Sequence, residues 1–353
     1  MTTTRAGNGS VEPAMRLNDL VGGAASIEAR RHPGMVVGAL QGPTGQSAVL
    51  GVGHERLPNG PVPAADTLFE IGSITKVFTG LLLAIAVVRG ELTLDTPVST
   101  FLPEPATVPS RDGAQITLAH LATHRSGLPR SPVGLLTEGR AVLVQGKNPY
   151  QEWTPERVLE AVAATRLRRA PGSGRIAYSN LGAGLLGLAL VAAAGARSYA
   201  ELVRTRISAP LGLVDTTVLE DAAGLPLATG YRGPGQRAVG HWSLSGLAGA
   251  GALLSSGRDM LTFLAAQLQP ESTPLAQEIV LSQEERHRGR RFGIALGWVL
   301  TGRRGDPILW HNGATGGFRS FAGFAPRRQA AVVLLANSRR GPEPAALRLL
   351  SRL

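Results

Sequence analysis

A serine and a lysine near residue 75 have the types and spacing that nucleophilic catalysis requires. Ser73 and Lys76 stand three positions apart in Ser73-Ile74-Thr75-Lys76, and the chain has one other lysine, Lys147. Positions three apart share a helix face, so the Lys76 amine can reach the Ser73 hydroxyl. A serine hydroxyl attacks weakly at neutral pH unless such a neighbour takes its proton. An N-cap serine followed by an ordinary helical lysine has the same pattern, but the rarity of lysine here favours catalysis.

A second group, Tyr178-Ser179-Asn180, follows the turn residues Pro171-Gly172-Ser173-Gly174 and precedes an apolar helical stretch. A tyrosine phenol can relay a proton, and an asparagine amide can orient a substrate carbonyl or a lysine amine. Taken alone, the motif is more typical of a structural tyrosine beside a helix-capping asparagine. The motif indicates catalysis only in combination with the other two groups.

A third group, His311-Asn312-Gly313-Ala314, ends a predicted strand. The small residues Gly313 and Ala314 let a substrate come close to the backbone. The Ala314 N–H can then pair with the Ser73 N–H as two donors to an oxyanion. A lone histidine such as His311 is more often a packing residue than a catalytic one.

In this order and spacing, the three groups resemble the serine β-lactamase and penicillin-binding-protein superfamily, above all class C β-lactamases and related esterases and D-amino peptidases. The resemblance covers about residues 35–338. It includes four accessory stretches, at residues 92–98, 116–129, 210–213 and 254–260. It implies the following roles: Ser73 as acylated nucleophile, Lys76 as its activating partner, Tyr178 as general base and acid, Asn180 as a substrate and lysine contact, and the Ser73 and Ala314 N–H groups as oxyanion hole.

The chain departs from this pattern at His311, where β-lactamases usually carry the lysine of Lys-Thr-Gly. That lysine is a permanent cation that binds the β-lactam carboxylate, whereas histidine is largely neutral at pH 7. We therefore expect a serine hydrolase acting on an ester or amide, a small-molecule substrate, with neither cofactor nor metal. Two alternatives stay open: a transacylase that passes the acyl group to an amine or alcohol in natural-product assembly, and a catalytically silent binding protein. The residues also leave open whether Lys76 or Tyr178 takes the serine proton.

The elements that must position these groups run from sheet to helices and back to sheet. Helices are predicted over residues 15–31, 73–88, 155–165, 181–196, 199–207 and 343–353; strands over 35–40, 47–52, 292–300, 308–311, 319–325 and 330–336. This order predicts an α+β fold. Residues 15–94 and 246–353 would form one antiparallel sheet flanked by helices, and residues 95–245 an inserted, mostly helical lobe. Substrate specificity would come from residues 129–151 and 230–245.

Composition excludes several other classes of protein. The 353 residues contain no cysteine, which removes disulfide scaffolds, thiol catalysis and cysteine-rich metal sites. The seven histidines are scattered, so we expect no metal site. The net charge of +11 comes almost entirely from scattered arginines with few aromatic residues, which argues against a nucleic-acid partner. A solvated basic surface is the simplest explanation, and an acidic partner or anionic substrate is the alternative.

The apolar stretch Leu181–Ala196 bears on two further interpretations. It is shorter than the roughly 20 residues that cross a bilayer, and residues 1–13 lack a secretory pattern, so we expect a cytoplasmic protein without a membrane partner. Its segment Gly182-Ala183-Gly184-Leu185-Leu186-Gly187 matches G-x-G-x-x-G, but no strand leads into it. Close helix packing explains these glycines better than a dinucleotide site does.

Overall fold

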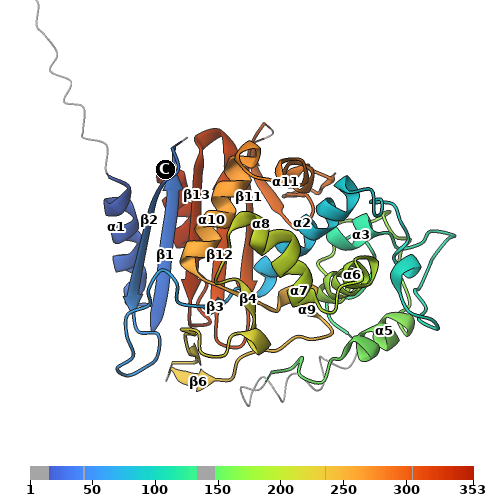
Figure 1. The fold of residues 1–353 in the computed structure, drawn as a ribbon, viewed down its shortest axis with the longest axis horizontal. Coiled ribbons are helices and arrows are strands. Elements are labelled where there is room, and N and C mark those ends of the chain that lie inside the picture. The colour runs from blue at the N-terminus through green and yellow to red at the C-terminus, as the bar shows by residue number, and fades with distance from the viewer. Residues whose placement is uncertain (1–15, 43, 133–147, 235, 304) are drawn as a thin grey trace, which may run out of the picture.

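The computed structural model describes residues 16–42, 44–132, 148–234, 236–303 and 305–353. Within these ranges, an eight-stranded antiparallel sheet carries helices on both faces, which confirms the α+β fold (Figure 1). Its strand order is β2-β1-β13-β12-β11-β10-β9-β8, so strands from opposite ends of the chain are neighbours in the sheet. Met35 of β1, for example, pairs with Ala336 of β13.

The strands of this sheet are β1 (Gly34–Gln41), β2 (Gln46–Gly53), β8 (His287–Arg288), β9 (Gly293–Ile294), β10 (Val299–Arg303), β11 (Asp306–Ala314), β12 (Arg319–Ala325) and β13 (Ala330–Ala336). Smaller sheets contain β3 (Phe69–Glu70), β7 (Leu253–Ser255) and β4 (Thr217–Val218), and β5 (Gly230–Arg232) with β6 (Arg237–Val239). The helices are α1 (Leu17–Ala29), α2 (Thr75–Val88), α3 (Leu118–Ala122), α5 (Pro155–Ala163), α6 (Asn180–Ala193), α7 (Tyr199–Val203), α8 (Ala209–Leu211), α9 (Ala248–Gly251), α10 (Gly257–Leu268), α11 (Ala276–Gln283) and α12 (Glu343–Arg352). Short 3₁₀ turns include Gly72–Ile74, and one π-turn spans Arg204–Ser208.

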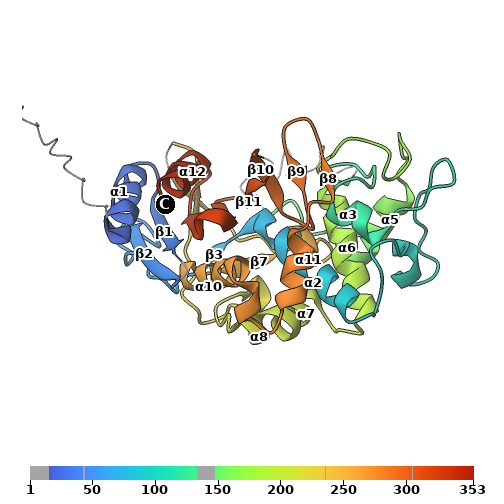
Figure 2. The same cartoon turned by 90° about the horizontal axis from the view of Figure 1, so that it is seen from above.

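All seven residues of β13 are apolar, as expected for a strand that is buried on both faces of the sheet. Successive strand side chains point to opposite faces. Val332 and Leu334 pack with α1 and α12, whereas Val333 and Leu335 join the larger core that includes α2 and α10. Figure 2 shows α1 and α12 on one side of the sheet and α10 on the other. A strand buried on both faces needs no polar alternation.

Most predicted strands agree with the structure, and residues 319–325 and 330–336 match β12 and β13 to the residue. The prediction of one strand over residues 292–300 is wrong. The chain forms β9 and β10 instead, with a turn between them where Gly297 has φ +86°. A Cβ at Gly297 would lie 2.4 Å from the Lys76 carbonyl oxygen, so this turn lets the chain pack directly on α2. Met15, which the helix prediction over residues 15–31 included, lies outside the described residues.

The G-x-G-x-x-G segment lies inside α6, and its glycines serve helix packing. Ser179 caps the helix by accepting a hydrogen bond from the Gly182 N–H. A Cβ at Gly184 would come within 2.4 Å of Leu247, and one at Gly187 within 2.9 Å of the Gly249 backbone. The packing interpretation is confirmed, because α9 approaches α6 too closely for larger side chains.

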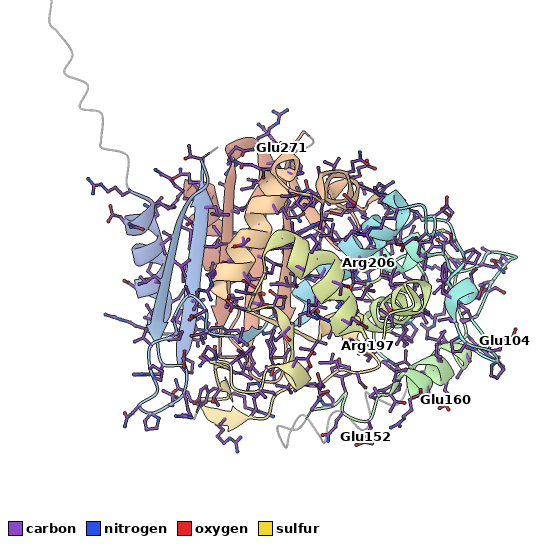
Figure 3. All side chains as sticks on the ribbon, viewed as in Figure 1. Glu104, Glu152, Glu160, Arg197, Arg206 and Glu271 are labelled. Carbon is purple, nitrogen blue, oxygen red and sulfur yellow. The ribbon has the colours of Figure 1, made fainter. Side chains whose placement is uncertain are left out.

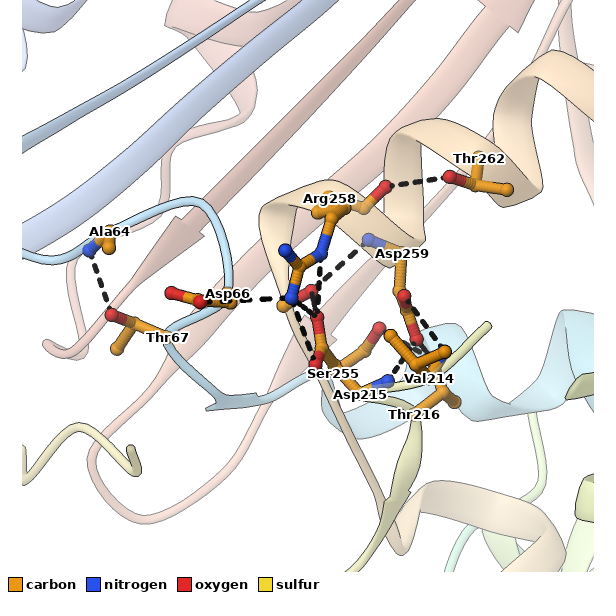
Figure 4. Close-up of polar contacts among 11 residues, drawn as sticks. Ala64, Asp66, Thr67, Val214, Asp215, Thr216, Ser255, Arg258, Asp259 and Thr262 are labelled. Carbon is orange, nitrogen blue, oxygen red and sulfur yellow. Dashed lines mark hydrogen bonds and ion pairs between the residues drawn. The ribbon is translucent and has the colours of Figure 1, made fainter. Parts of the chain in front are cut away.

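The start of α10 is fixed by a polar network that ties three distant segments together (Figure 4). Ser256 caps the helix, accepting from the Asp259 N–H. The Asp259 carboxylate accepts hydrogen bonds from the Asp215 N–H at 2.7 Å and the Thr216 hydroxyl at 2.8 Å. Arg258 forms an ion pair with Asp215 at 3.0 Å. The network anchors β7, which pairs with β3 just before Ser73.

Charged side chains lie mainly at the periphery of the molecule. Glu104, Glu152, Glu160 and Glu271 are all exposed (Figure 3). Arg206 of the π-turn pairs with Glu91, in the bend that follows α2, at 2.6 Å. In the part of the chain that the structure describes, no helix has both the length and the apolar character needed to span a membrane.

Candidate active site

Ser73 is held at the junction of β3 and α2 by a close approach of backbones. It lies in the 3₁₀ turn Gly72–Ile74, which runs directly into α2. Gly72 has φ +50°, and a Cβ there would lie 2.7 Å from the Ala314 backbone nitrogen. A Cβ at Gly313 would lie 1.9 Å from the Ile71 carbonyl oxygen. Both positions therefore require glycine, and the contact brings the backbones of Ser73 and Ala314 to one place.

Lys76 lies one helical turn beyond Ser73 and is buried, with 2% exposure. Its Nζ is 3.0 Å from the Ser73 hydroxyl oxygen and 2.6 Å from the Ala250 carbonyl oxygen in α9. None of the ion pairs among the described residues includes Lys76. Burial, reinforced by the Arg130 charge, lowers the pKa of the Lys76 amine well below its usual value. A neutral amine can donate to Ala250 and still offer its lone pair to the Ser73 hydroxyl proton.

The loop that carries Tyr178 is tied to the segment after α3. The Ser179 hydroxyl donates to the Pro129 carbonyl at 2.6 Å, and the Asn180 N–H donates to the Arg130 carbonyl at 2.8 Å. The Ser179 N–H donates to Nδ1 of the buried His124 at 3.2 Å. Two segments about fifty residues apart thus form one rigid wall beside Ser73.

Tyr178 lies between two basic side chains and His124. Lys76 Nζ is 4.9 Å and the Arg130 guanidinium carbon 5.0 Å from the ring centroid. The His124 ring centroid is 4.4 Å away. Burial raises the pKa of the Tyr178 phenol to about 12, although a hydrogen bond with Ser73 and the Arg130 charge oppose the rise. Tyr178 is therefore a neutral phenol at pH 7, in contact with the candidate nucleophile.

His311 lies on β11 next to this group, with its ring centroid 6.2 Å from that of Tyr178. Its Nδ1 is 2.7 Å from the Asn312 carbonyl oxygen, which can only accept a hydrogen bond. Nδ1 therefore carries the proton and Nε2 a lone pair. Burial and then the Lys76 charge lower the pKa of His311 to about 3. This histidine does not supply the cation that a lysine would at the same place.

A pocket opens beside Ser73. It is lined by Gly72, Ser73, Tyr150, Asn180, Trp242, Leu244, Leu247, Ala250, Gly251, Ala314 and Thr315. The Tyr150 and Trp242 rings meet edge to face at a centroid distance of 5.3 Å. The pocket has apolar walls with a few polar atoms, which is typical of a small-molecule site.

The structure thus brings Ser73, Lys76, Tyr178, Asn180, His311, Gly313 and Ala314 together around one pocket or its immediate wall. Sequence reasoning missed four neighbours: His124, Arg130, Tyr150 and Trp242. Weak signals existed, since His124 lies within the accessory family stretch at residues 116–129, and Tyr150 and Trp242 fall in the two segments predicted to set specificity. Residues 133–147 of the first segment lie outside the described residues. Among those described, no three histidine, aspartate or glutamate side chains cluster as metal ligands.

A family model described as Beta-lactamase matches residues 17–353. The chain is 29% identical over 314 residues to D-alanyl-D-alanine-carboxypeptidase/endopeptidase AmpH of Escherichia coli (strain K12), covering 84% of this chain and 77% of that protein. Among solved structures, the octameric penicillin-binding protein homologue from Pyrococcus abyssi superposes with TM-score 0.82 and 26% identity, covering 96% of this chain and 77% of the other. A class C beta lactamase from Rhodobacter sphaeroides gives TM-score 0.77 and 28% identity, covering 94% and 98%.

Proposed function

The chain belongs to the beta-lactamase family, and on that premise we propose that it hydrolyses an ester or amide through an acyl-enzyme formed on Ser73. The resemblance to serine β-lactamases and penicillin-binding proteins is confirmed by the family match and the two solved structures. The observation that carries the proposal is the 3.0 Å contact between the Ser73 hydroxyl and the buried Lys76 amine. Burial lowers the pKa of this amine, which makes its neutral, proton-accepting form easier to reach than that of an exposed lysine.

In the acylation step, Ser73 Oγ attacks the substrate carbonyl carbon while its proton passes to Lys76 Nζ. The negative charge that forms on the carbonyl oxygen is accepted by the Ser73 and Ala314 N–H groups. The alcohol or amine then leaves with a proton from the Tyr178 hydroxyl, which regains one from the Lys76 ammonium. We assign Lys76 rather than Tyr178 as the first base, because a phenol with a pKa of about 12 is almost never ionised at pH 7.

In the hydrolysis step, water attacks the Ser73 acyl carbonyl. The neutral Lys76–Tyr178 pair accepts the water proton and returns one to Ser73 Oγ as the carboxylic acid leaves. Both steps use the same short proton path, which is supported by the contacts of the Ser73 hydroxyl with Lys76 Nζ at 3.0 Å and with the Tyr178 hydroxyl. The acid–base contribution of such a group is worth about 10²–10⁴ in rate.

The neutral charge state of His311 guides the choice of substrate. Its pKa of about 3 leaves the strand beside the pocket without a cation at pH 7. A substrate carboxylate placed beside this strand therefore has no positive charge there to bind it. We therefore place neutral esters and amides ahead of β-lactams.

The decisive experiment labels the protein with a fluorophosphonate and maps the adduct by mass spectrometry. We expect one adduct on Ser73, lost in Ser73→Ala along with hydrolysis of p-nitrophenyl esters. Ser243→Ala is the matched control, because its hydroxyl near the pocket contacts the Glu220 carboxylate rather than an amine. A wild-type protein that neither forms an adduct nor hydrolyses esters would instead be a binding protein on this fold. Product partition toward added amines would identify a transacylase.

A further inference from the structure

Three polar atoms in the wall of the catalytic pocket are buried without a hydrogen-bond partner among the described residues. They are Asn180 Oδ1, Trp242 Nε1 and Thr315 Oγ1. A buried polar atom without a partner destabilises the fold, so such groups are rare and call for an explanation. Asn180 already has an expected role toward substrate, but Trp242 and Thr315 have none.

Trp242 is held firmly from its backbone side. Its N–H donates to Glu70 Oε1 at 3.1 Å, and His241 Nδ1 lies 2.8 Å from the same oxygen. Glu70 is 2% exposed and ends β3, three residues before Ser73. The Trp242 main chain is therefore tied to the strand that positions the nucleophile, while Tyr150 packs against the indole ring.

The indole N–H lies over the backbone that follows the candidate oxyanion hole. A Cβ at Gly316 would lie 2.6 Å from Trp242 Nε1, which is the nearest atom to it. Thr315, one residue earlier, is 5% exposed and contributes its unpaired hydroxyl to the same pocket. The Trp242 N–H and the Thr315 hydroxyl thus both lie beside the residues that directly follow Ala314, in the wall of the pocket that contains Ser73.

The chemistry of these groups restricts the ligand that fits them. An indole N–H is only a donor, so its partner must be an acceptor. The pocket lining in the described part of the chain contains no charged side chain, which favours a neutral acceptor over a carboxylate. A carbonyl oxygen satisfies both conditions.

We propose that Trp242 Nε1, assisted by Thr315 Oγ1, forms a subsite for a second, neutral carbonyl group on the acyl portion of the substrate. The inference rests on the proposed function and deepens it: the preferred substrate is an oxo-acyl or amide-bearing acyl compound, not a plain alkanoyl one. The subsite selects the substrate because its donor stays unpaired when an alkyl group takes the place of the carbonyl.

The test compares matched p-nitrophenyl esters that differ at one atom. Esters with a ketone at carbon 4, 5 or 6 of the acyl chain are paired with isosteres in which a methyl branch replaces the ketone oxygen. For at least one pair, wild type should prefer the ketone, and Trp242→Phe should reduce that preference in kcat/KM about 3- to 10-fold, the worth of one neutral hydrogen bond. Using the ratio cancels any general loss of activity or folding.

Trp310→Phe is the matched control, because the Trp310 indole N–H already donates to Thr301 Oγ1 at 3.1 Å on β10. It should leave every ratio unchanged. If Trp242→Phe also leaves the ratio of every pair unchanged while the esters are hydrolysed and Ser73 is labelled, the subsite is refuted and the proposed function stands. If wild type hydrolyses no ester and forms no Ser73 adduct, the proposed function fails and the subsite with it.

Discussion

Replacing Arg130 with glutamine tests whether neutral Lys76 is the base. Lys76 Nζ and the Arg130 guanidinium carbon lie 4.9 and 5.0 Å from the Tyr178 ring centroid, so their separation cannot exceed the sum of these, about 10 Å. The Arg130 charge lowers the pKa of Lys76 after burial, the larger cause. Arg130 itself is exposed, and none of the ion pairs among the described residues includes it.

The size of the effect follows from Coulomb's law. With the exposed cation treated at an effective dielectric constant of about 40–80, repulsion across about 10 Å is about 0.4–0.8 kcal/mol. Since one pKa unit corresponds to about 1.4 kcal/mol, Arg130→Gln should raise the pKa of Lys76 by about 0.3–0.6. Activity requires the neutral amine and is lost as pH falls below this pKa. The acidic limb of kcat/KM should therefore move to higher pH by that amount.

The assay is the pH profile of kcat/KM on a neutral p-nitrophenyl ester at low ionic strength. Arg130→Lys keeps the positive charge, so its acidic limb should stay at the wild-type pH. This control distinguishes the effect of the charge from the effect of a changed side-chain shape. Added salt should shift the wild-type limb in the same direction as Arg130→Gln and have little effect on the variant. The two histidines near Lys76 do not produce the acidic limb of kcat/KM themselves, because burial already lowers the pKa of His124 and of His311. A limb that moves equally in Arg130→Lys and Arg130→Gln, or moves to lower pH, contradicts the reasoning.

Two further predictions concern the same site. Tyr178→Phe should reduce turnover about 10²–10⁴-fold by removing the proton relay, while fluorophosphonate labelling of Ser73 persists; near-normal turnover would reassign the relay. Gly313→Ala should lower the free energy of unfolding by about 1–3 kcal/mol or more in thermal or urea melts, because the new Cβ would lie 1.9 Å from the Ile71 carbonyl oxygen. Gly23→Ala is its control: no atom lies within 4 Å of the added Cβ on α1, so its stability should equal or exceed that of wild type.

Much of the site could be predicted from the sequence because its signals are local. The spacing of Ser73 and Lys76 places them on one helix face wherever that helix lies. The apolar runs of β12 and β13 identify strands because both sheet faces are buried. The order of the three motifs then identified the family, since each motif alone also fits a structural interpretation.

Contacts between distant segments could not be predicted in this way. Arg130 and Tyr178 meet only because the Ser179 hydroxyl and the Asn180 N–H bond to the loop after α3. Gly297 gave no sign that it would interrupt a strand, because its turn is required by the Lys76 backbone on another element.

The groups available for acyl chemistry, and the helix and strands that carry them, follow from local sequence. Their ionisation and the unpaired donor of Trp242 depend on how distant parts of the chain pack together. The pKa of an amine such as Lys76 depends on how much water the surrounding chain excludes and which charges it brings near, and neither quantity is a property of local sequence.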